Sequence, residues 1–190
     1  MAKTATKKKP KLSLLNLIFS IVGMVGAVLS YIALAFNFIN TQTTIKIGSS
    51  SSTTSSTATL SEWFKAINDA QEYNAKLEGT VLGDLRVNID GWATARVFLI
   101  ITLVLVAIVA IALVVKFFVN NKILNWATLA VSILTVVSAL MFIIMVYAGG
   151  SAFVGKAENV KALADVGAWF VTLGAVIAGA MGIAVARKIK

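Results

Sequence analysis

The chain alternates between long apolar runs and short polar stretches. Four apolar runs cover residues 12–39, 97–115, 123–148 and 166–186, and none of them contains Asp, Glu, Lys or Arg. A helix needs about 20 apolar residues to cross ~30 Å of hydrocarbon, and all four runs reach that length within about one residue. Backbone groups in lipid must be satisfied within the segment, which favours helices over open strands. The sequence therefore predicts an all-α membrane protein with a four-transmembrane-helix bundle.

The acidic residues lie in only two of the stretches between these runs. All eight Asp and Glu side chains fall within residues 40–96 and 149–165. By contrast, residues 1–11, 116–122 and 187–190 carry Lys or Arg and no acid. Basic residues near span ends mark the cytoplasmic side of a membrane. We therefore expect an integral protein of the cell membrane with both termini in the cytoplasm and the two acidic stretches outside.

Composition narrows the class of protein further. Hydrophobic residues make up 58% of the chain and charged residues only 13%, against about 25% charged residues in soluble domains. The net charge of +9 gathers at the flanks of the apolar runs, which indicates contact with membrane lipids and not with nucleic acid. The sequence has no Cys and no His, which excludes disulfides and thiolate or imidazole metal sites. We expect no cofactor and no bound metal.

The first apolar run has a second interpretation. Lys7–Lys9, the apolar residues after them and Ala33-Leu34-Ala35 resemble a signal peptide with its cleavage site. The run is longer than the usual apolar region of about 7–15 residues, which favours a permanent span.

The first acidic stretch predicts a small α+β cap outside the membrane. Residues 49–57 contain only Ser and Thr, a composition typical of a mobile spacer. Thr43–Ile47 and Thr80–Ile89 are typical of strands, the second with a turn at Gly83-Asp84. We expect these strands to form a small sheet beside a helix.

That helix is predicted at residues 61–77, with Ser61 as the N-cap and Glu62 in the first turn. Trp63, Ile67 and Leu77 fall on one face of it. A lone helix of this length is marginal in water, so the apolar face must pack on something. The sequence leaves two hypotheses open: the face packs on the protein's own cap, or it is an interaction site for a partner protein or the lipid interface.

Small residues predict how the spans pack. Gly174, Ala178 and Gly182 recur at every fourth position of the last span, and Gly23 and Gly26 lie in the first. Small residues let two helix backbones approach closely in lipid. We expect the first and last spans to lie against each other, with packing against a partner chain as the alternative.

Two charges flank the spans on the outer side. Arg96 precedes the second span and Asp165 precedes the fourth. We expect a structural ion pair between them, with Asp90 as a competing partner for Arg96. No ionisable group lies deeper, where proton relays and ion pumps need one. The sequence also has no catalytic motif, so we expect a protein that is not an enzyme.

The stretch Ala93-Thr94-Ala95-Arg96, which leads into Val97-Phe98-Leu99, is similar to the entry of the second span in claudins. The short basic connector from Lys116 to Lys122 is similar as well. With these residues, the layout resembles the claudin and peripheral-myelin-protein group of tetraspan proteins. The resemblance implies a four-helix bundle with an outer cap. The group's Trp…Gly-Leu-Trp…Cys…Cys pattern is absent from this chain, so no functional residue follows from the resemblance apart from Arg96 as a structural one.

These observations favour a non-enzymatic four-span protein that binds other membrane or surface proteins, or a second copy of itself. It would act as a scaffold, an adhesion component or an accessory subunit. An oligomeric channel is one alternative, although the sequence suggests no polar stripe through any span. A membrane subunit of a small-molecule or lipid transporter is the other.

Overall fold

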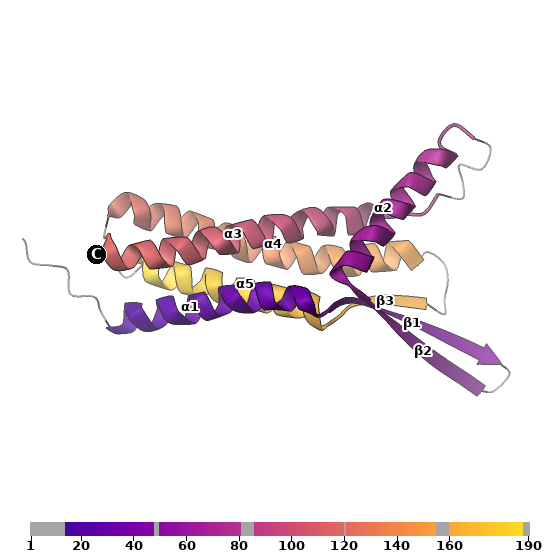
Figure 1. Ribbon diagram of the computed structural model, residues 1–190, viewed down its shortest axis with the longest axis horizontal. Coiled ribbons are helices and arrows are strands. Elements are labelled where there is room, and N and C mark those ends of the chain that lie inside the picture. Colours follow the sequence, from indigo (N-terminus) through magenta and orange to yellow (C-terminus); the bar gives the residue numbers. More distant parts are fainter. Residues whose placement is uncertain (1–13, 48–49, 81–85, 120, 155–159, 188–190) are drawn as a thin grey trace, which may run out of the picture.

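The computed structural model describes residues 14–47, 50–80, 86–119, 121–154 and 160–187. Most of these residues are helical, and a three-stranded sheet accompanies the helices (Figure 1). In chain order the elements are α1 (Leu14–Ile32), the 3₁₀ turn η1 (Ala33–Ala35), β1 (Asn37–Ile47), β2 (Ser50–Thr59), α2 (Leu60–Leu77), α3 (Asp90–Phe118), α4 (Lys122–Val154), β3 (Val160–Ala164) and α5 (Val166–Arg187).

Helices α1, α3, α4 and α5 form a bundle, and each is long and apolar enough to cross a membrane. In Figure 1 the sheet and α2 lie at one end of this bundle, which we call the cap end. The start of α1, the α3–α4 turn and the end of α5 lie at the other, which we call the terminal end. Contacts are most extensive between α3 and α4, α1 and α5, and α4 and α5. Helices α1 and α3 touch less, so the ring of helices is loosest between them.

Glycines bring α1 and α5 into close contact. A Cβ atom placed on Gly26 would lie 2.8 Å from the backbone oxygen of Gly174, and one on Gly174 would lie 2.5 Å from the oxygen of Gly26. Gly23 similarly faces Ala178 and the side chain of Leu113. The first and last long helices therefore lie against each other, as the small residues predict.

Gly182 has a different neighbour. A Cβ atom there would collide with the side chain of Ser132 on α4. The small-residue series of α5 therefore serves two contacts, one with α1 and one with α4.

The first long helix is shorter than its apolar run. The run predicts a span to residue 39, but α1 ends at Ile32 and the chain enters β1 at Asn37. Phe38 and Ile39 are apolar because they are buried in the core beneath the cap. Conversely, α3 and α4 extend beyond their predicted bounds toward the cap end, starting at Asp90 and ending at Val154.

The sheet has the strand order β2-β1-β3 with antiparallel neighbours. Its middle strand continues from α1 through η1, and β3 leads into α5 after one residue. The backbone N–H of Asp165 donates to the oxygen of Phe38 at 2.9 Å, where the two chains pass from sheet to helix. Helix α1 continues into β1, and β3 continues into α5. These two continuous arms run side by side.

The Ser/Thr run lies in strand β2, so the predicted spacer is wrong for its described residues 50–57. Thr is β-branched and favours extended backbone. Its partner strand β1 is also polar, and hydroxyl groups meet across the pair, as between Thr44 and Thr53 at 3.1 Å. Cross-strand pairing therefore orders a run that has no apolar side chains to bury.

The predicted strand at Thr80–Ile89 has a different outcome. Residues 81–85, with the expected turn, lie outside the described residues, and Arg86–Ile89 form no strand. The side-chain amide of Asn74 on α2 replaces a strand partner. It donates to the oxygen of Val87 and accepts from the nitrogen of Val87, both at 2.8 Å.

Helix α2 begins one residue earlier than predicted. Its N-cap is Thr59 and not Ser61, because Thr59 and Glu62 form a reciprocal capping box. Hydrogen bonds from the backbone and then the side chain of Thr59 hold the pKa of Glu62 below its usual value. The helix is therefore fixed directly at the end of β2.

Gly174→Ile should destabilise the bundle, because a branched side chain must displace the backbone and side chain of the facing α1 turn. Overpacking of this kind typically costs ~1–3 kcal/mol. Thermal aggregation of the protein in detergent measures the effect. Ala130→Ile on the exposed face of α4 is the matched control. Equal aggregation temperatures for both variants would contradict the close α1–α5 contact.

Candidate functional site

The apolar face of α2 is internal. Trp63 and Ile67 are 1% and 0% exposed, and they lie in a core that joins the cap to the bundle. Trp63 stacks on Phe38 of β1 at 6.3 Å between ring centroids and meets Trp92 of α3 edge-on at 6.5 Å. The docking hypothesis for Trp63 and Ile67 is therefore wrong for this fold, and packing on the protein's own cap is correct. Leu77, the third residue of the face, is half-buried.

Arg96 and Asp165 form no ion pair with each other. The guanidinium Nη1 of Arg96 donates to Oδ1 of Asn68 on α2 at 2.6 Å, and the group lies over the ring of Phe64. Asp165 instead accepts from the backbone N–H of Val166 at 2.8 Å, at the first turn of α5. The predicted ion pair of Arg96 is therefore not formed, and its partners come instead from α2, whose position the sequence does not indicate.

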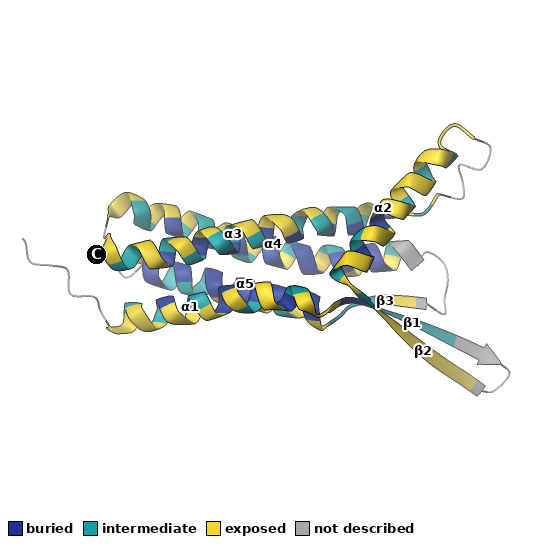
Figure 2. Cartoon of the chain, in the orientation of Figure 1, coloured by how far each residue is buried: buried dark blue, intermediate teal, exposed yellow. Residues whose placement is uncertain are grey.

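An unprotected sheet edge projects from the cap. Strand β3 pairs with β1 only from Ile39 to Thr43, so the rest of the β1–β2 hairpin extends beyond it. Strand β2 forms the other edge of the sheet, and almost all its described side chains are exposed (Figure 2). It contains no charged residue and no proline, the two kinds of residue that commonly block pairing at sheet edges.

A polar stripe runs along half of the buried face of α4. Its side chains are Asn125, Thr128, Ser132, Thr135 and Ser138, spaced by three or four residues. Sequence analysis missed this stripe, although the spacing alone indicates it. The expectation was that no polar stripe runs through a whole span, and this stripe covers only part of α4.

Three of the five side chains in the stripe have hydrogen-bond partners within the bundle. The hydroxyls of Thr128 and Thr135 donate to carbonyl oxygens one turn earlier in α4, at 2.7 and 2.8 Å. Ser138 exchanges a 2.8 Å hydrogen bond with Thr102 of α3. Toward the cap end the same face continues with the buried residues Ala139 and Phe142. The polar face therefore ends about halfway along the bundle.

The terminal end of the bundle holds several unpaired polar atoms. Lys116 Nζ, Asn125 Oδ1, Asn16 Oδ1 and Ser132 Oγ are buried and have no hydrogen-bond partner among the described residues. An unpaired buried donor or acceptor costs ~1–3 kcal/mol, and more if it is charged. Water, an ion or another bound molecule commonly supplies the missing partners of such groups.

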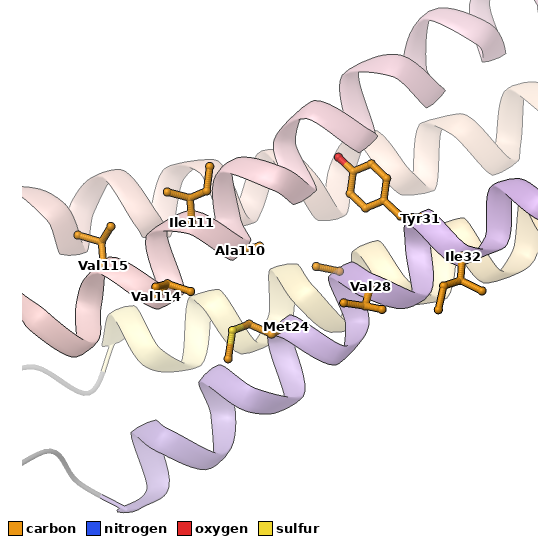
Figure 3. A pocket seen from close by; sticks show the side chains of 9 residues that line it. Met24, Val28, Tyr31, Ile32, Ala110, Ile111, Val114 and Val115 are labelled. Atoms are coloured by element: carbon orange, nitrogen blue, oxygen red, sulfur yellow. The ribbon is translucent and has the colours of Figure 1, made fainter.

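An apolar groove of about 530 Å³ separates α1 from α3 (Figure 3). Met24, Val28 and Ile32 line it from α1, and Ile111 and Val114 line it from α3. Tyr31 closes one part of the groove, because its hydroxyl donates to the oxygen of Leu103 at 2.7 Å. The lining suits a hydrocarbon chain or apolar side chains and offers a polar solute almost no hydrogen-bond partner.

Within the described part of the chain, no three His, Cys, Asp or Glu side chains lie close enough together to hold a metal ion. No protein-family model matches the chain, and a search of curated proteins finds no significant match. The sheet edge, the polar atoms at the terminal end and the groove are therefore the features on which a function can be argued.

Ile67→Lys should lower the free energy of unfolding by a few kcal/mol, because it places an unpaired charge in the core between cap and bundle. Ala66→Lys is the matched control, since Ala66 is the exposed neighbour on the same helix. Thermal unfolding in detergent, followed by tryptophan fluorescence, compares the two. A stable Ile67→Lys protein would show that α2 does not pack on the bundle in solution.

Proposed function

We propose that the chain is an integral protein of the cell membrane that crosses the bilayer four times and has its termini in the cytoplasm. Four apolar helices of sufficient length support the crossings. The acid-free terminal end, with Lys116, Lys122 and Arg187, supports the orientation, because cytoplasmic loops carry an excess of basic residues. The cap then lies outside the cell.

The protein's function in this proposal is not enzymatic: it binds other proteins through its cap. The observation that carries the proposal is the open edge of β2. An edge strand presents a row of unpaired backbone N–H and C=O groups, onto which a strand of another chain can add. Soluble proteins usually block such an edge with Lys, Pro or a covering element, and β2 has none of these within its described residues.

The partner in this proposal is a strand of a surface protein or β2 of a second copy. Antiparallel pairing of two β2 strands is self-complementary, as a two-fold dimer requires. The polar, uncharged side chains of β2 suit such pairing outside the membrane, since they keep the free hairpin soluble and create no repulsion. A scaffold, an adhesion component or an accessory subunit would each use a surface of this kind.

The claudin-like layout remains part of this proposal. A bundle of four helices with a small sheet and a helix at one end is compatible with it. The channel alternative has less support, because the polar face of α4 ends at Ala139 and Phe142.

The orientation is tested with single introduced cysteines. The natural chain contains no Cys, so it gives no background labelling. A cysteine at Ser52 in β2 should react with a membrane-impermeant thiol reagent in intact cells. A cysteine at Asn121 in the α3–α4 turn should react only after the cells are permeabilised. Labelling of position 121 in intact cells would reverse the orientation.

The binding edge is tested by adding charge to it. Thr54→Lys with Ser56→Lys should abolish association, because lysines on an edge strand oppose strand addition. Gln71→Lys with Ala75→Lys on the exposed side of α2 adds the same charge to the cap and should leave association intact. Mass photometry in mild detergent measures self-association, and chemical cross-linking on cells measures binding to other surface proteins. Undiminished association of the β2 variant in both assays would exclude this edge as the interface.

A further inference from the structure

The two edges of the sheet differ in how they are protected. Strand β3 forms one edge, is five residues long and carries the exposed Lys161. Helix α4 also approaches this strand, since a Cβ atom on Gly150 would lie 2.5 Å from the oxygen of Ala162. Strand β2 forms the other edge, is ten residues long and contains no charged residue and no proline. The sheet is therefore blocked at one edge and open to strand addition at the other.

The side chains of β2 suit pairing with an identical strand. Apart from Ala58, every residue of β2 is Ser or Thr, so two copies bring no like charges together. Hydroxyl side chains can also bond across a strand pair, as Thr44 and Thr53 do within the hairpin at 3.1 Å. An antiparallel pair of this length forms about ten backbone hydrogen bonds, the number found in a typical protein interface. A second copy of β2 can therefore fill the whole edge.

The hairpin is directed away from the bundle. Strand β1 follows α1 after one 3₁₀ turn, and the ladder from Ile39–Ala164 to Thr43–Val160 holds it against β3. In Figure 1 both strands of the hairpin run outward from the cap end, on the side opposite to the terminal end. With the membrane orientation proposed above, β1 and β2 therefore project from the outer surface of the membrane and do not lie along it.

This direction decides how two copies can pair. Two copies in one membrane share the outward direction, so the two-fold axis that relates them is the membrane normal. Rotation about that axis leaves both β2 strands with the same direction relative to the membrane, so they cannot become antiparallel. A parallel pair of the same edge about this axis would set N–H opposite N–H and C=O opposite C=O, which forms no ladder. The geometry therefore excludes a β2–β2 pair within one membrane.

We propose that β2 pairs with β2 of a second copy in an apposed membrane, antiparallel and across the gap between the two surfaces. A copy in the facing membrane presents β2 in the opposite direction, which satisfies the antiparallel ladder and the two-fold symmetry together. The two three-stranded sheets then form one continuous sheet, in which both β2 edges are covered. The inference rests on the binding edge and the membrane orientation proposed above, and it specifies the partner as the same chain in another membrane.

Full overlap of the two strands gives a definite register. It places Ser52 opposite Thr57 of the second copy, with the two-fold axis between Thr54 and Ser55. Ten extended residues measure about 33 Å, so the pair joins membranes whose outer surfaces lie a few nanometres apart. Many copies in one such contact act together, because each pair holds the next within reach of its partner.

Vesicle clustering tests the pairing. The full chain is reconstituted into two populations of phosphatidylcholine vesicles with different lipid dyes, and labelling of Ser52→Cys measures the share of outward caps. Wild-type vesicles should cluster, as energy transfer between the dyes and light scattering report. Thr54→Lys with Ser56→Lys should reduce clustering about five-fold or more, because lysines oppose strand addition. Gln71→Lys with Ala75→Lys on α2 is the matched control and should cluster as the wild type does.

Either of two outcomes would overturn the proposal: wild-type vesicles that do not cluster, or clustering that the β2 lysines leave unchanged.

Introduced cysteines test the direction of the strands. Vesicles with Ser52→Cys are mixed with vesicles with Thr57→Cys under mild oxidation, and the two proteins carry different tags. A disulfide should join the two chains, because the positions face each other. Two differently tagged populations of Ser52→Cys should yield about five-fold less, since these positions lie five residues apart along the ladder, about 17 Å, beyond the reach of a disulfide. Equal yields in the two mixtures would show that the strands are not paired in this way.

The binding edge and this inference fail in different ways. Self-association in detergent that depends on β2, without clustering of vesicles, would keep the edge as a binding site and overturn only the pairing across membranes. The same disulfide between two tagged chains that share one vesicle, in a suspension too dilute to cluster, would also overturn it. No association in detergent and none between vesicles would exclude the edge itself.

Discussion

The aromatic contact between Phe38, Trp63 and Trp92 is the interaction on which the arrangement of the molecule depends. These rings come from three different elements, β1, α2 and α3, at residues 38, 63 and 92 of the chain. Aromatic pairs of this kind contribute ~0.5–1.5 kcal/mol beyond the area that they bury. The β1–β3 ladder also ties the hairpin to the bundle, but the aromatic core is what packs α2 against both β1 and α3, and it thereby positions Asn68 for its bond with Arg96.

The sequence predicts the four long helices well, because hydrocarbon-length apolar runs leave little choice of structure. It also predicts the α1–α5 contact, because small residues such as Gly26 and Gly174 indicate where two helix backbones come close together. It fails where an apolar residue serves another purpose. Phe38 and Ile39 look like the end of a span, but they fill the core beneath the cap.

The candidate sites were less predictable for a related reason. The Ser/Thr run carries no periodic signal, and only its pairing with β1 makes it a strand. The position of Asn68 beside Arg96 depends on how α2 lies across the bundle, which local sequence does not encode. The polar stripe on α4 was different, because the spacing from Asn125 to Thr135 is visible in the sequence. Its hydroxyl and amide groups carry no charge, so they leave the apolar run uninterrupted by any charged residue.

The continuity of helix and strand in the two arms has a mechanical consequence. Strand β1 follows α1 after one 3₁₀ turn, and β3 leads into α5 through Asp165 alone. A force on the hairpin would therefore pass along α1 directly, without a slack linker to absorb it. The ladder from Ile39 to Thr43 and the glycine contact at Gly26 would carry that force in shear to β3 and α5. The two arms therefore form two continuous backbone paths from the sheet to the opposite end of the bundle.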